Sequence, residues 1–386
     1  MHLVFLCNEY PPAPHGGIGS FVQTLAGALA AAGHRVTVCG LYPRELEGES
    51  EDQGVRIIRL ARTGPPGLRI LINYHRIRER LRQLHRQSPI SIIEGDDDTA
   101  RVFGGRIPAS IPTVLRMHGG YLFFEAAAGR VPVAYHVWLE RRAYNTARHL
   151  AAVSRYVGVR TGELLRLGNR PFTVIHNCVD LKLFQSETGS GEEEGLIVFA
   201  GTLIEKKGIR QLIEAMDQVG RACPQARLAV YGGDTVDPST GGSYRQILEA
   251  SLTPLARKHV EFPGRVERLR LPGILAGASI CCYPSHMEAM PIAWIEGMAM
   301  GKAVLASSLG PGPEVVTDGE DGLLVDCRQP DLIAGALIRL LRDAGLRRRL
   351  GEAARRRATK DYGLDLHVRR NLDFYRAVID GTAPGR

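Results

Sequence analysis

Short apolar segments alternate with longer amphipathic segments along most of the 386-residue chain. The apolar segments have the length of strands, and the amphipathic segments carry apolar residues at helical spacing. In the first half, the pattern predicts strands at residues 2–7, 35–40, 55–60, 90–95, 112–118, 149–154 and 172–176. The helices predicted between them span residues 19–32, 71–87, 133–145 and 156–165.

A second series of the same kind follows residues 177–194, which are polar, partly acidic and without apolar periodicity, as in a linker. Its predicted strands are residues 196–200, 227–232, 260–262, 279–283 and 303–307. Its predicted helices are residues 208–223, 290–300, 331–343, 346–360 and 364–380. Alternating strands and helices predict an α/β fold with two parallel sheets, and ligands of such sheets bind at the carboxyl ends of the strands.

The formal net charge of +8 is concentrated in the first 180 residues, which contain 22 basic and 15 acidic residues. Part of this excess is a run from Arg76 to Arg86 in one predicted helix. A solvated helix face explains the run, and an anionic membrane surface or an anionic acceptor are the functional alternatives. No motif of a nucleic-acid-binding protein accompanies the charge, so a nucleic-acid partner is not expected.

Seven cysteines are scattered through the chain without the spacing of a zinc or redox motif. We expect them to be buried, small apolar residues in a reducing compartment. The first residues lack the pattern of a secretory signal, and no apolar run is long enough to span a membrane. These observations predict a cytoplasmic protein.

Three glycines, Gly16, Gly17 and Gly19, lie between the first predicted strand and the first predicted helix. Glycine lets a backbone approach a ligand, and the N–H groups at the start of a helix attract anions. The turn is a candidate diphosphate site, and a tight turn without a ligand is the alternative. It matches neither the dinucleotide-binding fingerprint nor the P-loop.

Two carboxylates eight residues apart, Glu288 and Glu296, flank the start of a predicted helix that Pro291 opens. Glu288 should lie in the preceding loop and Glu296 inside the helix, with the backbone N–H groups of Met290 and Ile292 directed at a ligand. Carboxylates there can accept hydrogen bonds from sugar or ribose hydroxyls. A surface charge is the alternative for Glu296.

The segment from Gly201 to Gly208 contains Lys206 and Lys207 just before its final glycine, at the start of another predicted helix. A cation is unfavourable there because of the helix dipole, unless a bound anion offsets it. A solvated lysine pair is the alternative. His118, at the end of a predicted strand, is a candidate hydrogen-bond partner or proton carrier, and a structural histidine is the alternative.

Together and in this order, these segments resemble the retaining glycosyltransferases of family 4, which have the GT-B fold. Residues 9–12, Glu-Tyr-Pro-Pro, with the glycine turn resemble the family's donor-phosphate loop. Residues 201–208 match its G-R-x4-K-G motif, residues 288–296 its E-x7-E motif, and residues 313–325 its closing signature. The resemblance covers nearly the whole chain.

The resemblance implies two Rossmann-like domains that face each other across a cleft. Residues 1–180 would form an acceptor-side domain, which the C-terminal helix at 363–386 rejoins. Residues 181–362 would bind a nucleotide-sugar donor. Transfer would retain the anomeric configuration without a metal ion or a cofactor, so that basic side chains and helix N-termini stabilise the leaving group.

Roles for single residues follow from the same resemblance. Lys207 would neutralise the diphosphate, His118 would contact the donor sugar, and Glu288 would hold its hydroxyls; these three are the expected catalytic residues. Glu296 would hold the ribose. The full expected donor-binding set is Gly16, Gly17, Gly19, Thr202, Lys206, Met290, Pro291, Ile292 and Glu296. A UDP-sugar is favoured as the donor, and the acceptor would be a small molecule, a natural product or a lipid-linked sugar.

Thr202 replaces the arginine of the family motif, which removes a bidentate phosphate ligand that Lys206 would have to replace. Asp96, Asp97 and Arg116 are candidates for hydrogen bonds on the acceptor side, and no metal site is expected. Two alternatives stay open. One is another GT-B activity, such as a nucleotide-sugar epimerase or a phosphorylase. The other is a non-catalytic nucleotide-sugar-binding partner protein, which Thr202 would explain.

Overall fold

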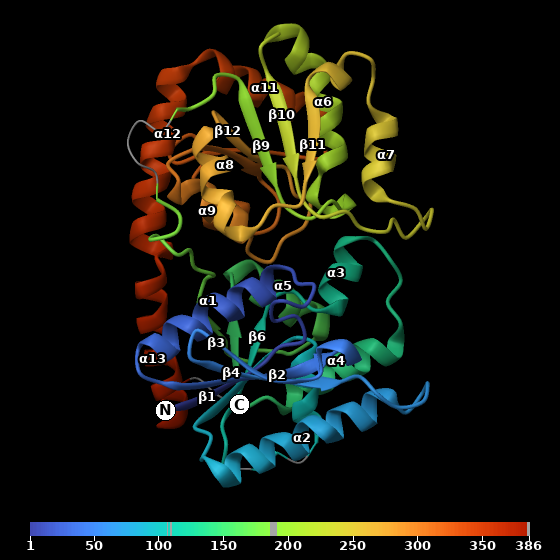
Figure 1. Ribbon diagram of the computed structural model, residues 1–386, viewed down its shortest axis with the longest axis vertical. Coiled ribbons are helices and arrows are strands. Elements are labelled where there is room, and N and C mark those ends of the chain that lie inside the picture. Colours follow the sequence, from blue (N-terminus) through green and yellow to red (C-terminus); the bar gives the residue numbers. More distant parts are fainter. Residues whose placement is uncertain (106, 109, 186–190, 384–386) are drawn as a thin grey trace. The chain divides into compact units, whose positions relative to one another are not determined.

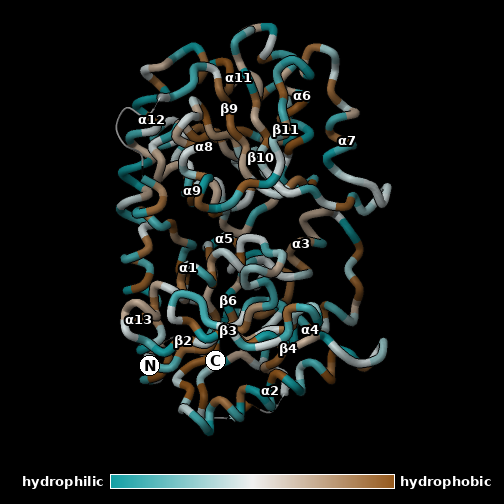
Figure 2. Tube along the Cα trace, viewed as in Figure 1, coloured by the Kyte–Doolittle hydropathy of each residue, from teal (hydrophilic) through white to brown (hydrophobic). Residues whose placement is uncertain are grey.

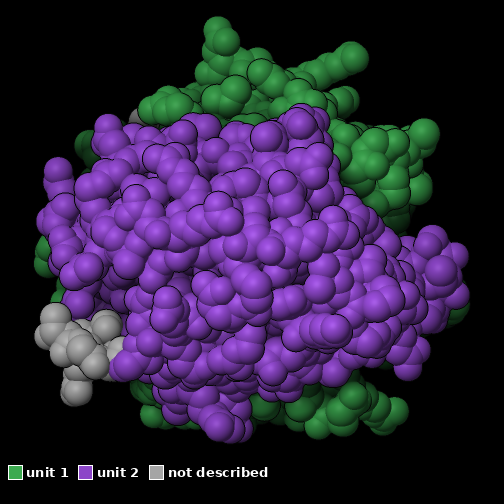
Figure 3. Space-filling view, turned by 90° about the horizontal axis from the view of Figure 1, so that it is seen from above, with its two compact units in different colours: residues 1–177, 364–386 green, residues 178–363 purple. Residues whose placement is uncertain are grey.

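Figure 1 shows the computed structural model, which describes residues 1–105, 107–108, 110–185 and 191–383. The chain forms two compact units, coloured separately in Figure 3. Unit 1 comprises Met1–Asn177 and Leu364–Arg386, and unit 2 comprises Cys178–Gly363. Residues 186–190 of the expected linker and residues 384–386 of the expected C-terminal segment lie outside the described residues.

Unit 1 contains an eight-stranded sheet in the order β3-β4-β2-β1-β5-β6-β7-β8. Neighbouring strands are parallel except β3 and β4, which form an antiparallel edge. The strands are β1 (His2–Leu6), β2 (Arg35–Tyr42), β3 (Gly48–Asp52), β4 (Val55–Ala61), β5 (Ile92–Asp96), β6 (Thr113–Met117), β7 (His149–Ala152) and β8 (Thr173–Val174). The strand order reverses between β1 and β5, which is where ligands of such sheets bind.

The helices of unit 1 are α1 (Gly17–Ala31), α2 (Arg69–Gln87), α3 (Tyr121–Ala127), α4 (Ala134–Thr146), α5 (Arg155–Leu165) and the last helix, α13 (Leu364–Ile379). Short 3-10 turns lie at η1 (Arg44–Leu46) and η2 (Thr99–Gly104).

Unit 2 contains a six-stranded, fully parallel sheet in the order β11-β10-β9-β12-β13-β14. The strands are β9 (Leu196–Ala200), β10 (Arg227–Tyr231), β11 (Val260–Gly264), β12 (Ile280–Tyr283), β13 (Ala303–Ser307) and β14 (Leu323–Val325). Here the order reverses between β9 and β12, so this pair marks the expected ligand position.

The helices of unit 2 are α6 (Ile209–Ala222), α7 (Tyr244–Ser251), α8 (Leu271–Gly277), α9 (Ile292–Ala299), α10 (Gly312–Val315), α11 (Pro330–Arg342) and α12 (Ala344–Arg357). A π-helical turn, η6 (Ala358–Tyr362), continues α12, and 3-10 turns lie at η3 (Glu205–Lys207), η4 (Ala256–Lys258) and η5 (Arg268–Arg270). Among the described residues, no helix combines the length and the apolar character that a membrane span requires.

The central strands are buried along their whole length, as helices on both faces of a parallel sheet require. Figure 2 shows the hydrophobic character of β9, whose sequence Leu-Ile-Val-Phe-Ala is apolar throughout. In unit 2, α6 buries Leu212, Met216 and Val219 at helical spacing and packs against α11. All seven cysteines are buried, which confirms that part of the sequence-based interpretation.

The structure differs from the predicted elements in several places. The edge strand β3 (Gly-Glu-Ser-Glu-Asp) was not predicted, because its residues are mostly exposed and lack an apolar pattern. Helices α3, α7, α8 and α10 and strand β14 were also missed. The strand expected at residues 172–176 is reduced to the two residues of β8. The break before the last helix falls at Gly363, as predicted. Beside this break, the N–H of Val179 donates to the carbonyl of Tyr362.

A buried ion pair ties α13 into unit 1. Arg116, on β6, donates to both carboxylate oxygens of Glu94, at 2.7 and 2.8 Å, and to Asn371 of α13 at 2.6 Å. The hydroxyl of Tyr375, also on α13, donates to Glu94 at 2.9 Å. Arg116 is 1% exposed, and its charge is neutralised inside the unit. The structure therefore shows Arg116 engaged in holding the C-terminal helix, and its expected contact with an acceptor stays a prediction.

Candidate functional site

Three loops meet at the carboxyl edge of the unit 2 sheet, where β9, β10 and β12 end. The N–H of Leu203 donates to the carbonyl of Gly233, after β10, at 2.9 Å. The N–H of His286, after β12, donates to the carbonyl of Lys206 at 2.9 Å. The loop with residues 201–208 is therefore held on both sides, at the point where the strand order reverses.

Gly208 shows why this loop must end in glycine. Its φ of 68° is in the left-handed region, and a Cβ atom would lie 1.9 Å from the carbonyl oxygen of Pro284. Any side chain here would push the loop after β9 away from the loop after β12. The glycine at this end of the segment is thus required for packing between the two loops.

Lys207 and Glu288 form an ion pair across these two loops. The side chains are 23% and 12% exposed, so the pair is mostly shielded from water but still reachable. Lys206 lies beside them; burial and the charge of Lys207 lower its pKa, while Glu288 raises it. The structure therefore brings two of the three expected catalytic residues into direct contact and excludes a freely solvated lysine pair.

Glu296 is the fifth residue of α9, after Met290 and Pro291, which are buried just before that helix begins at Ile292. Its side chain is 4% exposed, and its Oε1 lies 2.8 Å from Nη1 of Arg268. Burial raises the pKa of Glu296, and Arg268 opposes that shift. Glu296 is consequently not a surface charge. Arg268 was missed from the sequence because it lies outside every motif.

Thr202, in the position of the family arginine, is exposed just beyond β9. It lies on the same loop as Lys206 and Lys207, so the loop retains two cations next to Glu288. A phosphate group at this edge would have lysine ammonium groups as partners in place of the forked arginine contact.

In unit 1, packing within the protein explains part of the glycine turn, as the alternative of a tight turn without a ligand predicts. A Cβ atom on Gly19 would lie 2.1 Å from the carbonyl oxygen of Glu9, so packing alone requires glycine there. The N–H of Gly19 donates to the Glu9 carboxylate at 2.6 Å. The start of α1 thus already has an anion from the protein's own chain, which the sequence analysis did not foresee. A Cβ on Gly17 would meet no atom within 4 Å, and one on Gly16 would meet only the Glu9 carboxylate, at 3.8 Å.

His118 lies directly after β6, with its ring 5.2 Å from that of Phe21. Burial and the nearby charge of Arg116 lower the pKa of His118 to about 3. The imidazole is therefore neutral near pH 7 and a weak base. Of the two predicted roles, this favours the hydrogen-bond partner over the proton carrier.

Asp96 and Asp97 organise the turn beside His118. Asp96 accepts hydrogen bonds from the N–H groups of Asp98 and Thr99, at 2.9 and 2.8 Å. Asp97 accepts from the N–H of His118 at 2.7 Å and from the hydroxyl of Tyr144. Burial raises the pKa of each carboxyl to about 7. Their oxygens thus accept hydrogen bonds from the backbone and side chains of unit 1, and their expected contacts with an acceptor stay a prediction.

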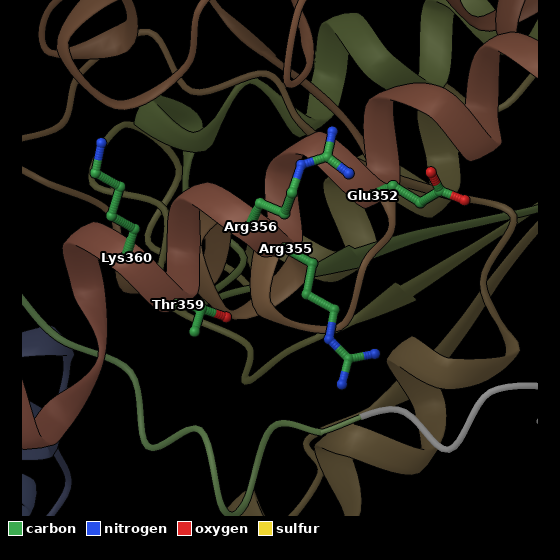
Figure 4. Close-up of a pocket in the computed structure, with 5 residues that line it drawn as sticks. All are labelled: Glu352, Arg355, Arg356, Thr359 and Lys360. Carbon is green, nitrogen blue, oxygen red and sulfur yellow. The ribbon is translucent and has the colours of Figure 1, made fainter.

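A separate hollow on α12 and η6, shown in Figure 4, contains none of these residues. It is lined by Glu352, Arg355, Arg356, Thr359 and Lys360. The side chain of Arg355 lies near Gly301, which precedes β13, at the amino edge of the sheet. The hollow is therefore at the opposite edge from Lys207 and Glu288. Within the described residues, no group of three or more His, Cys, Asp or Glu side chains could hold a metal ion.

Replacing His118 with glutamine should change how stability depends on pH. The pKa of His118 is about 3 in the folded protein and near 6.5 when unfolded, so below pH 6.5 only the unfolded chain binds the proton. The stability that the neutral histidine provides is present above pH 6.5 and is lost as the pH falls toward 3. Relative to the variant, wild-type unfolding free energy should fall by up to about 1.4 kcal/mol per pH unit between pH 6 and 4.

Urea denaturation followed by circular dichroism at several pH values measures this difference. Asp96 and Asp97 have raised pKa values, so their contribution has the opposite sign and is lost as the pH rises through about 7. Both aspartates remain in the variant, so their effect cancels in the comparison. A difference between the two proteins that stays constant from pH 7.5 to 4 would contradict the assigned pKa of His118.

Comparisons with known proteins agree with the sequence motifs. The family model described as "Glycosyltransferase Family 4" matches residues 15–183, and the model described as "Glycosyl transferases group 1" matches residues 182–357. The glycogen synthase of Mycobacterium tuberculosis is 26% identical over 420 residues, which cover 99% of this chain and 96% of that protein.

Two solved structures share the fold over the whole chain. Sucrose-phosphate synthase from Thermosynechococcus elongatus has a TM-score of 0.84 at 21% identity, covering 99% of this chain and 100% of that chain. Anabaena HepE in complex with UDP and glucose has a TM-score of 0.78 at 16% identity, covering 98% and 100%. With two consecutive family models spanning residues 15–357 and a parallel-sheet unit under each, this chain belongs to family 4 of the glycosyltransferases and has the GT-B fold.

Proposed function

We propose that this glycosyltransferase moves a hexose from a nucleoside-diphosphate sugar to a hydroxyl acceptor, with retention and without a metal ion. The observation that carries the proposal is the contact between Lys207 and Glu288 at the switch point of unit 2. Such a pair places one group suited to a phosphate next to one suited to sugar hydroxyls. Glu296 supplies a third polar group on the helix that follows Glu288.

The two lysines would act on the leaving group. As the bond between sugar and diphosphate breaks, negative charge grows on the nucleoside diphosphate, and Lys206 and Lys207 would neutralise it at a largely desolvated position. A diphosphate would compete with Glu288 for Lys207. The Glu288 carboxylate would then be released to accept hydrogen bonds from the donor sugar. Glu296 would accept hydrogen bonds from the ribose.

We assign unit 2 to the donor and unit 1 to the acceptor. In unit 1, His118 would contact the donor sugar as a neutral hydrogen-bond partner, held by the Asp97 contact to its backbone. Gly16 and Gly17 would approach the diphosphate, whereas the N–H of Gly19 is already bound to Glu9. A UDP-sugar is the favoured donor, since a protein of the same fold was solved with UDP and glucose.

Calorimetric titration with UDP, GDP, ADP and TDP in the presence of EDTA tests the donor site. We expect one of them to bind without metal, and the Lys207→Ala variant to bind it roughly ten- to a hundredfold more weakly. The loss combines a missing charge-assisted hydrogen bond with the negative charge that Glu288 would then present to the diphosphate. Lys258→Ala, which removes an exposed lysine of η4 in the same unit, is the matched control and should bind normally.

Failure of all four diphosphates to bind would contradict the proposal. Binding by the wild-type protein that Lys207→Ala leaves unchanged would contradict the role of the lysine. Thr202 supports one alternative, a partner protein that binds nucleotide sugars without turnover. That alternative predicts diphosphate binding but no release of diphosphate from any nucleotide sugar.

We further propose that unit 1 contacts the surface of an anionic membrane from the cytoplasmic side, which would suit a lipid-linked acceptor. Most arginines of α2 do not support this contact as the charge pattern suggested, because they bind within unit 1. Arg76 donates to the carbonyl of Ala61, Arg78 donates to the carbonyl of Val102 at 2.8 Å, and Arg80 pairs with Glu49.

The surface around the start of α4 is better suited to contact an anionic membrane. Val131 is 92% exposed, and Val133, Tyr135 and Trp138 are each at least half exposed. The rings of Tyr135 and Trp138 stack with centroids 6.2 Å apart, and the guanidinium of Arg142 lies 5.7 Å from the Trp138 ring. Aromatic rings next to arginine are typical of side chains at a lipid headgroup layer.

The double variant Tyr135→Ala, Trp138→Ala should lose binding to vesicles that contain anionic lipid, because the exposed rings are its main apolar contact. Vesicle co-sedimentation measures the bound fraction, and vesicles without anionic lipid should bind the wild-type protein weakly. Val159→Ala, an exposed apolar residue of α5, serves as the control. Equal sedimentation of the wild-type protein and the double variant would argue against this surface.

A further inference from the structure

Arg268 connects three segments of unit 2 that are distant in sequence. It begins η5, shortly after β11, and its Nη1 lies 2.8 Å from Oε1 of Glu296 on α9. Its guanidinium carbon lies 5.3 Å from the centroid of the Phe184 ring. The side chain of Arg268 is 31% exposed, whereas that of Glu296 is 4% exposed. The arginine thus covers the carboxylate from the solvent side.

A carboxylate at such a buried position needs a cation. Burial favours the protonated form of Glu296, and the charge of Arg268 favours the ionised form. The charged and titratable groups described around Glu296 are Arg268, from η5, and the phenol of Tyr283, from β12. A protonated carboxyl loses acceptor capacity, which weakens its recognition of two neighbouring hydroxyls.

We propose that Arg268 is a positioning residue for nucleotide recognition, which holds Glu296 as an oriented carboxylate whose second oxygen, Oε2, binds the ribose hydroxyls of the donor. The inference rests on the proposed function, which assigns Glu296 to the ribose. It adds that the specificity for a ribonucleotide depends on a residue outside the family motifs. Phe184 contributes by restricting the plane of the guanidinium.

A competing role for Arg268 is to replace the arginine that Thr202 has removed, by binding the diphosphate directly. That role would draw the guanidinium away from Glu296 and leave a carboxylate unpaired in a site that is almost fully buried. Breaking a buried ion pair costs more than one hydrogen bond to a charged group contributes. Arg268 therefore stays with Glu296, and the diphosphate is left to Lys206 and Lys207.

The Arg268→Gln variant separates the two roles when UDP and 2′-deoxy-UDP are titrated at pH 6 and at pH 8.5. At pH 6, the variant should bind UDP about tenfold more weakly, while its affinity for 2′-deoxy-UDP changes little. The preference for UDP should partly return at pH 8.5, because Glu296 without its cation ionises only at higher pH. Arg270→Gln, an exposed arginine of the same turn, is the matched control and should keep the preference.

Two further variants extend the test, and the first of them keeps it decisive if Arg268→Gln folds poorly. Arg268→Lys retains the charge and should retain most of the preference for UDP. Adding Arg268→Gln to Glu296→Gln should cause no further loss of UDP affinity, because the arginine acts through the glutamate.

Three results would overturn the inference: equal weakening of UDP and 2′-deoxy-UDP by Arg268→Gln, an additive loss in the double variant, or a lysine variant as impaired as the glutamine variant. Equal weakening would assign Arg268 to the diphosphate and leave the proposed function intact. A wild-type protein that binds neither nucleotide would overturn the proposed function itself, and with it this inference.

Discussion

The ion pair between Lys207 and Glu288 links the two loops on which the donor chemistry depends. Each loop follows one of the two adjacent strands at which the sheet order reverses. The pair is supported by backbone contacts, since the His286 N–H donates to the Lys206 carbonyl and Gly208 packs on Pro284. In the proposed function, the two opposite charges would exchange partners when a phosphate and a sugar bind. One local rearrangement would then serve to recognise two parts of one donor molecule.

Buried carboxylates that an arginine neutralises occur in both units. In unit 1, Arg116 holds Glu94 and, through Asn371 and Tyr375, the C-terminal helix. In unit 2, Arg268 holds Glu296. Removing one partner of such a pair is costly because the other charge stays buried. The first pair fixes the C-terminal helix to unit 1, and the second, in our proposal, orients a side chain that would bind the ribose.

The sequence predicted most strands, because the inner strands of parallel sheets, such as β1 and β9, are continuous apolar runs. It missed β3, since a polar edge strand leaves no such pattern. The sequence analysis explained the glycine turn by a bound diphosphate, but the structure shows a different reason for one of its glycines. Gly19 is required by the carbonyl of Glu9, whereas Gly16 and Gly17 have no such packing constraint. Arg116, Asp96 and Asp97 were assigned to an acceptor because their residue types fit one. The structure shows partners for all three within unit 1, and those of Arg116 and Asp97 lie far away in sequence. Arg268 gave no signal at all, since only the fold brings it to Glu296.

In the proposed function, Lys207 and Glu288 support transfer from a nucleotide sugar with retention. Proton NMR of the sugar that the enzyme releases by slow transfer to water, with UDP-glucose as donor and EDTA present, tests it most directly. We predict that the α-anomer appears first and that Glu288→Gln abolishes its formation. A β-anomer as the first product, or release that Glu288→Gln does not affect, would contradict the account.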